Sequence, residues 1–391
     1  MQYVMDLARR AILLGLAAMP SAMPSAKASA GLTPPKPLVI KPRAVRITGI
    51  SHRVLTGTGD DTNVDDLGRD LEMHGTHFGD PAFVGPYMSE DQSKAVFKPR
   101  TPSRACVVRN GVALNDVHQG LIGDCWFLSA LDFSIAHPRY RGRVADGGLF
   151  EEVFGGEPNV CRISLFDMSS DEWQVTHVGP KLLLDGMRFP ATVSAVSSDP
   201  DELWPSLVEK GLAKMCTRPT NGTRGYNALG GGWMSEAMCY LHGRGQCYFV
   251  PRVEVLPRAL EEPGHCARMM RALLDGGCGL FVVWAKEVFP QLSQGLVSNH
   301  GYAVLDVDPS AGTVTLKNPW GRGLWASSVS TGTDAPKGVF TMSVQDVIMR
   351  CAGLDVYEPA GTEELARLGF EVVPFVPASG RARRRGPFDL L

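Results

Sequence analysis

The residues best able to do chemistry lie in the stretch 119–131, which reads QGLIGDCWFLSAL. A turn with two glycines precedes Cys125, and an apolar run follows it. This order predicts a thiol in the first turn of a helix, where free N–H groups and the helix dipole favour the thiolate. Gln119 could supply an amide donor to a developing oxyanion. The alternative is a buried cysteine that opens a core helix, because cysteine is among the most buried residues.

A histidine and an asparagine that could act together with Cys125 follow in the second half of the chain. Residues 300–307 alternate as a strand does, with His300 at the start, and residues 313–316 predict the next strand. That strand ends in Asn318, Pro319, Trp320 and Gly321, where proline prevents the ladder from continuing. Adjacent antiparallel strands would place Asn318 beside His300, 18 positions earlier.

These motifs resemble the calpain family of papain-like cysteine proteases. The stretch QGLIGDCWFL matches that family's nucleophile signature, HGYAV is similar to its HAYSV, and NPWG is identical. The segments ELWPSLVEK and GVFTMS resemble its EFWxxLLEK helix and GEFWMS strand. The resemblance covers about residues 110–349. It implies an α+β, papain-like fold of two subdomains, with a helical half that carries the nucleophile and an antiparallel β-rich half that carries His and Asn.

The resemblance also implies an activity, a cysteine endopeptidase that hydrolyses protein and peptide substrates. Cys125 would attack as a thiolate whose pKa is lowered by the His300 imidazolium and the helix N-terminus. His300 would protonate the leaving amine, and Asn318 would fix the imidazole. Gln119 and the Cys125 N–H would form the oxyanion hole, and Trp320 would shield the His–Asn bond.

Glycines and acidic residues extend the predicted site. Gly231 and Gly232 lie in a run similar to the crossing between the two calpain subdomains. They could act as a hinge, as backbone that binds substrate, or as both. By the resemblance, Gly111, Asp116 and Glu202 are ligands of a calcium site in the first half. The ligands of a second calcium site are replaced by Leu324, Thr331, Lys337 and Val339. We therefore expect one calcium site at most, or calcium-independent activity, and no cofactor for the chemistry.

Composition is that of an ordinary globular protein. The chain has 391 residues, 44% of them hydrophobic, and a net charge of −2, which gives no support to nucleic-acid binding. Its nine cysteines form no C-x-x-C pair, which favours a reduced compartment. The sequence predicts five parts: a leader (1–44), a lead-in (45–98), a Cys subdomain (99–230), a His/Asn subdomain (231–355) and a solvated C-terminal tail (356–391).

The first 30 residues leave the location of the protein open. A short apolar run after Arg9 and Arg10 ends in a small-residue stretch, as in a secretory signal, although an organelle transit peptide and a disordered leader fit too. The run is too short to span a bilayer. We expect a cytoplasmic protein, with secretion or organelle targeting through residues 1–30 as the alternative.

Two other functions compete with an active protease. One is a catalytically silent, calpain-like scaffold that binds partners. The other is an acyl transferase of the transglutaminase type, which would need Asp where Asn318 stands. The oligomeric state is not predicted.

Overall fold

The computed structural model describes residues 39–40, 97–100, 106–153, 160–168, 171–185, 193–215, 225–252, 255, 262, 264–284, 296–297, 300–321, 338–368 and 371–372. All of them belong to one compact unit, Leu38–Leu391. The predicted leader and lead-in, apart from residues 39–40 and 97–98, lie outside the described residues, as does the arginine-rich end of the chain.

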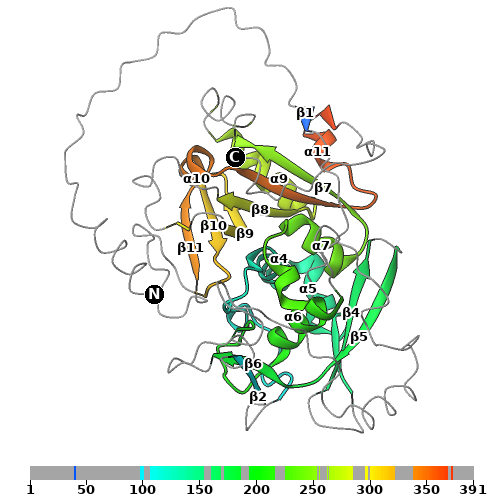
Figure 1. Cartoon of the computed structure of the whole chain (residues 1–391). Helices are drawn as coiled ribbons and strands as arrows, with labels where there is room; N and C mark the ends of the chain where they lie inside the picture. Colours follow the sequence, from blue (N-terminus) through cyan, green and yellow to red (C-terminus); the bar gives the residue numbers. More distant parts are fainter. Residues whose placement is uncertain are drawn as a thin grey trace, which may run out of the picture. The chain divides into compact units, whose positions relative to one another are not determined.

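The largest element is an antiparallel six-stranded sheet in the order β11-β10-β9-β8-β12-β7 (Figure 1). In chain order its strands are β7 (Gly245–Pro251), β8 (Gly279–Trp284), β9 (His300–Asp308), β10 (Thr313–Lys317), β11 (Val339–Ser343) and β12 (Gly353–Pro359). The predicted strands over 300–307 and 313–316 are confirmed, as is the strand that the resemblance implied over 338–343.

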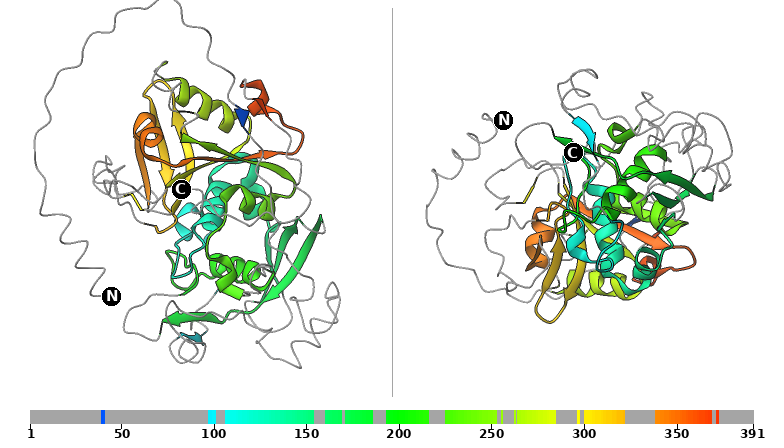
Figure 2. Two further views of the ribbon diagram at one scale, coloured as in Figure 1. Left: turned by 45° about the horizontal axis from the view of Figure 1, so that its top comes forward. Right: turned by 90° about the horizontal axis from the view of Figure 1, so that it is seen from below.

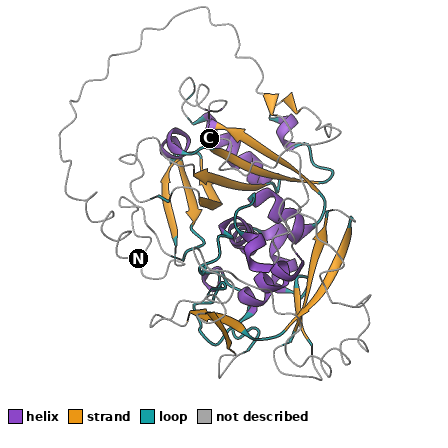
Figure 3. Cartoon of the chain, viewed as in Figure 1, coloured by secondary structure: helices purple, strands orange, loops and turns teal. Residues whose placement is uncertain are grey.

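Helices gather between this sheet and a smaller one (Figure 3). The helices between the two sheets are α4 (Cys125–Ala136), α5 (Pro138–Ala145), α6 (Trp204–Met215) and α7 (Met234–His242); the 3₁₀ turn η2 (Leu114–Asp116) contacts α4, and η3 (Gly225–Leu229) contacts α6. Helices α9 (His265–Asp275) and α10 (Val344–Arg350) contact strands of the large sheet and each other, and α11 (Glu364–Arg367) contacts α9. The predicted helix over 201–210 exists but begins at Trp204, with Pro205 in its first turn, where a missing N–H costs nothing. Among the described residues, no helix is both long and apolar enough to cross a membrane.

Three small sheets complete the architecture (Figure 2). The antiparallel strands β3 (Phe150–Glu152), β4 (Cys161–Asp167) and β5 (Glu172–Val178) form the smaller sheet that α6 and α7 contact. The strand pairs are β2 (Phe97–Arg100) with β6 (Leu182–Asp185), and β1 (Val39–Ile40) with β13 (Glu371–Val372). The predicted α+β class of the fold is confirmed.

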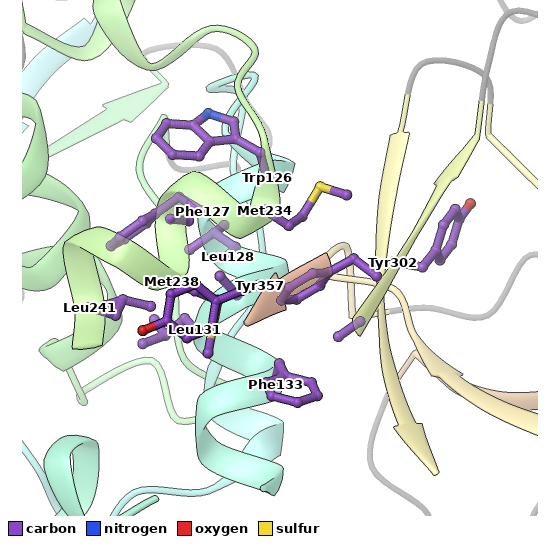
Figure 4. Packing of buried hydrophobic residues seen from close by; sticks show 14 of the residues in the cluster. Trp126, Phe127, Leu128, Leu131, Phe133, Met234, Met238, Leu241, Tyr302 and Tyr357 are labelled. Atoms are coloured by element: carbon purple, nitrogen blue, oxygen red, sulfur yellow. The ribbon is translucent and has the colours of Figure 1, made fainter. Parts of the chain in front are cut away.

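The core surrounds α4, which is apolar on most of its circumference. Its side chains pack against Met234, Met238 and Leu241 of α7, and Tyr302 of β9 and Tyr357 of β12 belong to the same buried cluster (Figure 4). A helix that is apolar all round must be covered on all sides. The nucleophile helix is therefore the element on which the helices and the large sheet converge.

The predicted boundary of the C-terminal tail is wrong. β12 crosses it and lies inside the large sheet, between β8 and β7, with all seven residues buried. The strand escaped sequence inspection because it contains Asp355 and Glu358, which break the apolar pattern. Asp355 is buried because the N–H and hydroxyl of Ser235 donate to its carboxylate at 3.0 and 2.7 Å.

Candidate active site

Cys125 is the first residue of α4, as predicted. The turn before it is held by the bond from the Gly231 N–H to the Gly123 carbonyl (2.8 Å). A backbone hydrogen bond from Gly301, the residue after His300, reaches the Cys125 thiol. One turn further along α4, the Ser129 hydroxyl donates to the Gly301 carbonyl at 3.0 Å. The Cys125 helix and the His300 strand are thus joined through both backbone groups of one residue, Gly301.

His300 opens β9 and contacts Asn318, the residue just after β10. The antiparallel register pairs Lys317 with Ala303, and the His300 Nε2 to Asn318 Oδ1 distance is 2.9 Å. The Trp320 backbone N–H, which can only donate, also reaches Asn318 Oδ1 (3.0 Å). That bond identifies the asparagine atom as oxygen, so His300 Nε2 must donate its hydrogen to it. In the neutral ring, Nδ1 is then the nitrogen that can accept a proton.

Trp320 lies against the imidazole, as predicted. The ring centroids of His300 and Trp320 are 4.8 Å apart, with planes at 51°. Tyr302 meets the same imidazole edge-on, with centroids 5.0 Å apart at 87°. Two aromatic rings therefore restrict the orientation of the imidazole and remove it from water.

The charge state of the pair differs from our expectation of a thiolate and an imidazolium. Cys125 is 6% exposed and His300 is 2% exposed. Burial raises the pKa of the Cys125 thiol to about 11, only partly opposed by the Gly301 hydrogen bond. Burial also lowers the pKa of His300 to about 4, although the bond to Asn318 favours its protonated form. In both groups desolvation outweighs the hydrogen bonds that favour the charged form, so burial favours a neutral thiol and a neutral imidazole.

This difference predicts the pH dependence of Cys125 alkylation. With a thiol pKa of about 11, the rate with iodoacetamide in the absence of substrate should rise about tenfold per pH unit from pH 7 to 10. Peptide mapping by mass spectrometry measures the rate at Cys125 itself. A rate that is constant across neutral pH would instead indicate a preformed thiolate–imidazolium pair.

Gln119 sits at the mouth of the nucleophile turn. Its Nε2 donates to the Ile122 carbonyl at 2.6 Å, and its backbone N–H donates to the Pro319 carbonyl at 2.7 Å. An amide nitrogen carries two hydrogens, so the bond to Ile122 orients the group and leaves the second hydrogen to serve an oxyanion. The bond to Pro319 ties this loop to the turn that carries Asn318.

A pair of buried carboxyls next to the thiol went unrecognised in the sequence. Asp124 directly precedes Cys125 and interacts with Glu209 of α6; both are fully buried. Burial raises the pKa of Asp124 to about 7, and burial followed by the charge of Asp124 raises that of Glu209 well above its ordinary value. Two adjacent buried carboxyls cannot both ionise, so the pair retains a proton. The negative charge that would oppose a Cys125 thiolate is thereby reduced.

The two candidate glycines have different surroundings. A Cβ on Gly232 would lie 2.5 Å from the Trp126 ring, whose Nε1 donates to the Leu229 carbonyl at 2.7 Å. Gly232 is therefore needed for packing. Gly231 has φ +80°, is exposed, and would meet nothing within 4 Å of a Cβ. Its open side lies beside the nucleophile turn, where an extended substrate could approach the backbone.

The predicted calcium ligands do not form a cage in this structure. Both oxygens of Glu202 accept hydrogen bonds, Oε1 from the Arg109 N–H (2.9 Å) and Oε2 from the Ser197 hydroxyl (2.8 Å). Asp116 Oδ2 accepts from the N–H of Ala113 at 2.7 Å. Gly111, with φ +81°, lies in the same loop. Within the described ranges, no three His, Cys, Asp or Glu residues are grouped closely enough to hold a metal.

The same region contains a cationic side chain that pairs with two other carboxylates. The Arg109 guanidinium pairs with Asp199 at 3.1 Å and with Asp201 at 3.2 Å. Burial, and the neighbouring charge of Glu202 to a lesser extent, raise the pKa of Asp116. As arranged, the residues present do not fit a calcium ion. Of the positions substituted in the second calcium site, Leu324, Thr331 and Lys337 lie outside the described residues.

Three further polar residues support the site, and sequence inspection missed them. Ser129 and Asp132 follow Cys125 at four and seven positions on α4, and therefore share its helix face. Lys317 directly precedes Asn318 and is buried beside Asp132, with 3.9 Å between Nζ and Oδ1. The sequence signal that could have identified Ser129 and Asp132 was their helical spacing from Cys125 in an otherwise apolar helix.

Comparison with known proteins gives consistent results. Residues 98–345 match the model of the family described as calpain family cysteine protease. The chain is 27% identical to the calpain-1 catalytic subunit of Gallus gallus over 282 residues, which is 66% of this chain and 37% of that protein. It is 28% identical to calpain-9 of Mus musculus over 225 residues (56% and 30%) and 26% identical to the calpain-2 catalytic subunit of Homo sapiens over 277 residues (64% and 36%). The matched region thus spans about a third of these relatives.

Proposed function

Because this chain belongs to the calpain family of cysteine proteases, we propose that it is an active endopeptidase that hydrolyses protein substrates through Cys125, His300 and Asn318. The observation that supports this most directly is the arrangement of the proton shuttle. His300 Nε2 donates to Asn318 Oδ1 at 2.9 Å, while the nucleophile helix is bonded to the next residue of the same strand. In a thiol–imidazole–amide triad, the amide orients the imidazole through such a bond.

The proposed reaction begins from the neutral pair. As the Cys125 sulfur attacks the peptide carbonyl, its proton passes to Nδ1 of His300, and a carbon–sulfur bond forms while the carbonyl π bond opens to an oxyanion. His300 then gives that proton to the leaving amine, and the carbon–nitrogen bond breaks. Water, deprotonated by His300, hydrolyses the thioester and restores the thiol. Asn318 stabilises the transient imidazolium.

The oxyanion would be held by two donors from the nucleophile turn. They are the free hydrogen of Gln119 Nε2 and the backbone N–H of Cys125, which as the first helical residue has no partner within the helix. Loss of one such donor typically costs about 3 kcal/mol of transition-state stabilisation. Trp320 would exclude water from the His300–Asn318 bond while the imidazolium exists.

Cleavage of casein by the full chain tests this function. We expect fragments from the wild-type protein and covalent modification of Cys125 by a peptidyl epoxide. The modification should be selective for Cys125, because His300 would take the proton of that thiol. Intact casein, together with an epoxide that reacts with all cysteines alike, would contradict an active protease.

We also propose that this catalysis does not require calcium. A calcium ion at Gly111, Asp116 and Glu202 would have to displace the N–H and hydroxyl donors that now serve these carboxylates. The Arg109 guanidinium already supplies positive charge to the loop. The casein assay should therefore give equal rates in calcium and in a chelator. Activation by calcium, whether one ion or two are bound per chain, would disprove this.

A second candidate function is a catalytically silent scaffold. The burial that raises the Cys125 pKa to about 11 and lowers that of His300 to about 4 favours it, because the resting pair is not activated. The two functions differ in the outcome with substrate present. A scaffold would bind peptide without acylation of Cys125, whereas a protease would accumulate a thioester when the leaving group is activated.

A further inference from the structure

A single buried lysine connects the parts of the active site. Lys317 ends β10, and its side chain, like that of Asp132, is 0% exposed. Its ammonium lies 3.9 Å from Asp132 Oδ1 and also donates to the carbonyls of Val117 at 3.5 Å and Asn318 at 3.3 Å. The two carbonyls lie within hydrogen-bonding distance of the ammonium, whereas Asp132 acts on it as a charge at a longer distance.

The three partners belong to three different segments. Asp132 lies on the Cys125 face of α4, two helical turns from the thiol. Val117 lies two residues before Gln119, and Asn318 is the predicted triad amide. One side chain therefore contacts the nucleophile helix, the loop of the oxyanion donor and the turn that orients the imidazole.

The Asp132–Lys317 pair is poorly suited to stabilise the fold by itself. Neither Asp132 oxygen has a hydrogen-bond donor among the described residues, so Lys317 supplies its compensating charge there. Burial raises the pKa of Asp132 to about 7 and lowers that of Lys317, each shift being reduced by the partner's charge. Two charges removed from water are often no more stabilising than apolar residues of similar volume. A positional role explains the presence of the pair better than a gain in folding free energy.

We propose that Lys317 is a positioning residue for peptide hydrolysis, which holds α4, the Gln119 loop and the Asn318 turn in the register that the reaction needs. The inference rests on the proposed protease function. Lys317 does not touch the reacting atoms. Asp132 keeps the ammonium charged and in place, and the two carbonyls transmit its position to the oxyanion loop and the asparagine.

Four variants of the full chain separate this role from a structural one. Lys317→Met removes the ammonium, Lys317→Arg keeps the charge, and the double variant Asp132→Leu/Lys317→Met removes both buried charges. Lys214→Met is the matched control, because Lys214 is also buried and donates to a backbone carbonyl, that of His177 at 2.8 Å, away from the triad. Each variant is measured for kcat and KM on a peptide, thermal midpoint, and Cys125 alkylation rate.

The double variant gives the decisive result. It should recover most of the thermal midpoint lost in Lys317→Met, because no uncompensated charge remains. Its kcat should stay about 100-fold below wild type with little change in KM, since small displacements of catalytic groups have effects of that size. Lys317→Arg should recover most of kcat. Lys214→Met should lower the thermal midpoint and leave kcat unchanged.

Alkylation makes the test independent of proteolysis. If α4 loses its register, the Cys125 thiol should be more accessible and react about tenfold faster than in wild type. Recovery of both thermal midpoint and kcat in the double variant, or wild-type kcat in Lys317→Met, would overturn the proposal. If the wild-type chain hydrolyses no peptide, the protease function fails, yet equal alkylation rates in wild type and double variant would still refute the positioning role by themselves.

Discussion

Replacement of Cys125 by alanine is expected to lower kcat/KM on a peptide substrate by about 10⁴-fold or more, because no other group can form the acyl intermediate. His300→Ala should have an effect of similar size, since the neutral Cys125 thiol, with its pKa of about 11, depends on the imidazole to take its proton. The double variant should be no worse than either single one. Residues that act as one unit do not contribute additively.

A cysteine outside the site provides the control. Cys106 is half-buried, and its thiol donates to the Asp201 carbonyl at 3.5 Å. Serine can make the same bond, so Cys106→Ser should keep kcat/KM at the wild-type value. Thermal midpoints of all variants, measured by circular dichroism, would exclude unfolding as the cause. Additive losses in the double variant would show that Cys125 and His300 do not act together.

Gly321→Ala should give the largest loss of stability of any single methyl addition at the turns beside β10. Gly321 has φ +65°, and a Cβ there would lie 1.6 Å from Nδ1 of His118. The His118 ring is held by the Asn115 carbonyl at 2.7 Å and the Ser198 hydroxyl at 2.8 Å, so it cannot easily move aside. We expect a loss of about 1–2 kcal/mol from the left-handed backbone and about 1–3 kcal/mol more from overpacking.

Gly312→Ala separates these two contributions. Gly312 flanks the other end of β10 with nearly the same φ, +64°, but a Cβ there would meet nothing within 4 Å. The loss of unfolding free energy in Gly312→Ala should equal the backbone cost alone, as measured by urea unfolding. Gly321→Ala should also lower kcat, because Gly321 donates to the Asn318 carbonyl at 3.0 Å and closes the triad turn. Equal losses in the two variants would mean that the loop around His118 yields to the added methyl.

The local order of residues in the sequence was sufficient to place the three candidate catalytic residues on their secondary-structure elements. Glycines before Cys125 predicted the helix that it opens, and alternation after His300 predicted β9. The short spacing from His300 to Asn318 implied neighbouring strands, which the antiparallel pairing of β9 and β10 confirms. These inferences succeeded because turns, helix starts and hairpins depend on residues close together in the chain.

Long-range contacts decided what the sequence could not. The second half of β12 was assigned to a solvated tail, because the burial of this strand depends on distant partners such as Ser235, which donates to Asp355 from 120 positions away. The pairing of Asp132 with Lys317 likewise depends on tertiary contacts between segments far apart in the chain. Burial also favours the neutral forms of Cys125 and His300 over the expected ion pair, and that burial depends on segments far apart in the chain.

The amino-acid order thus determined which groups could form a thiol protease site and on which elements they stand. Only the tertiary structure determined how much water reaches them and which distant side chains hold them in register. Desolvation and ion pairing depend on everything packed around a group, and that packing exists only after segments far apart in the chain have come together.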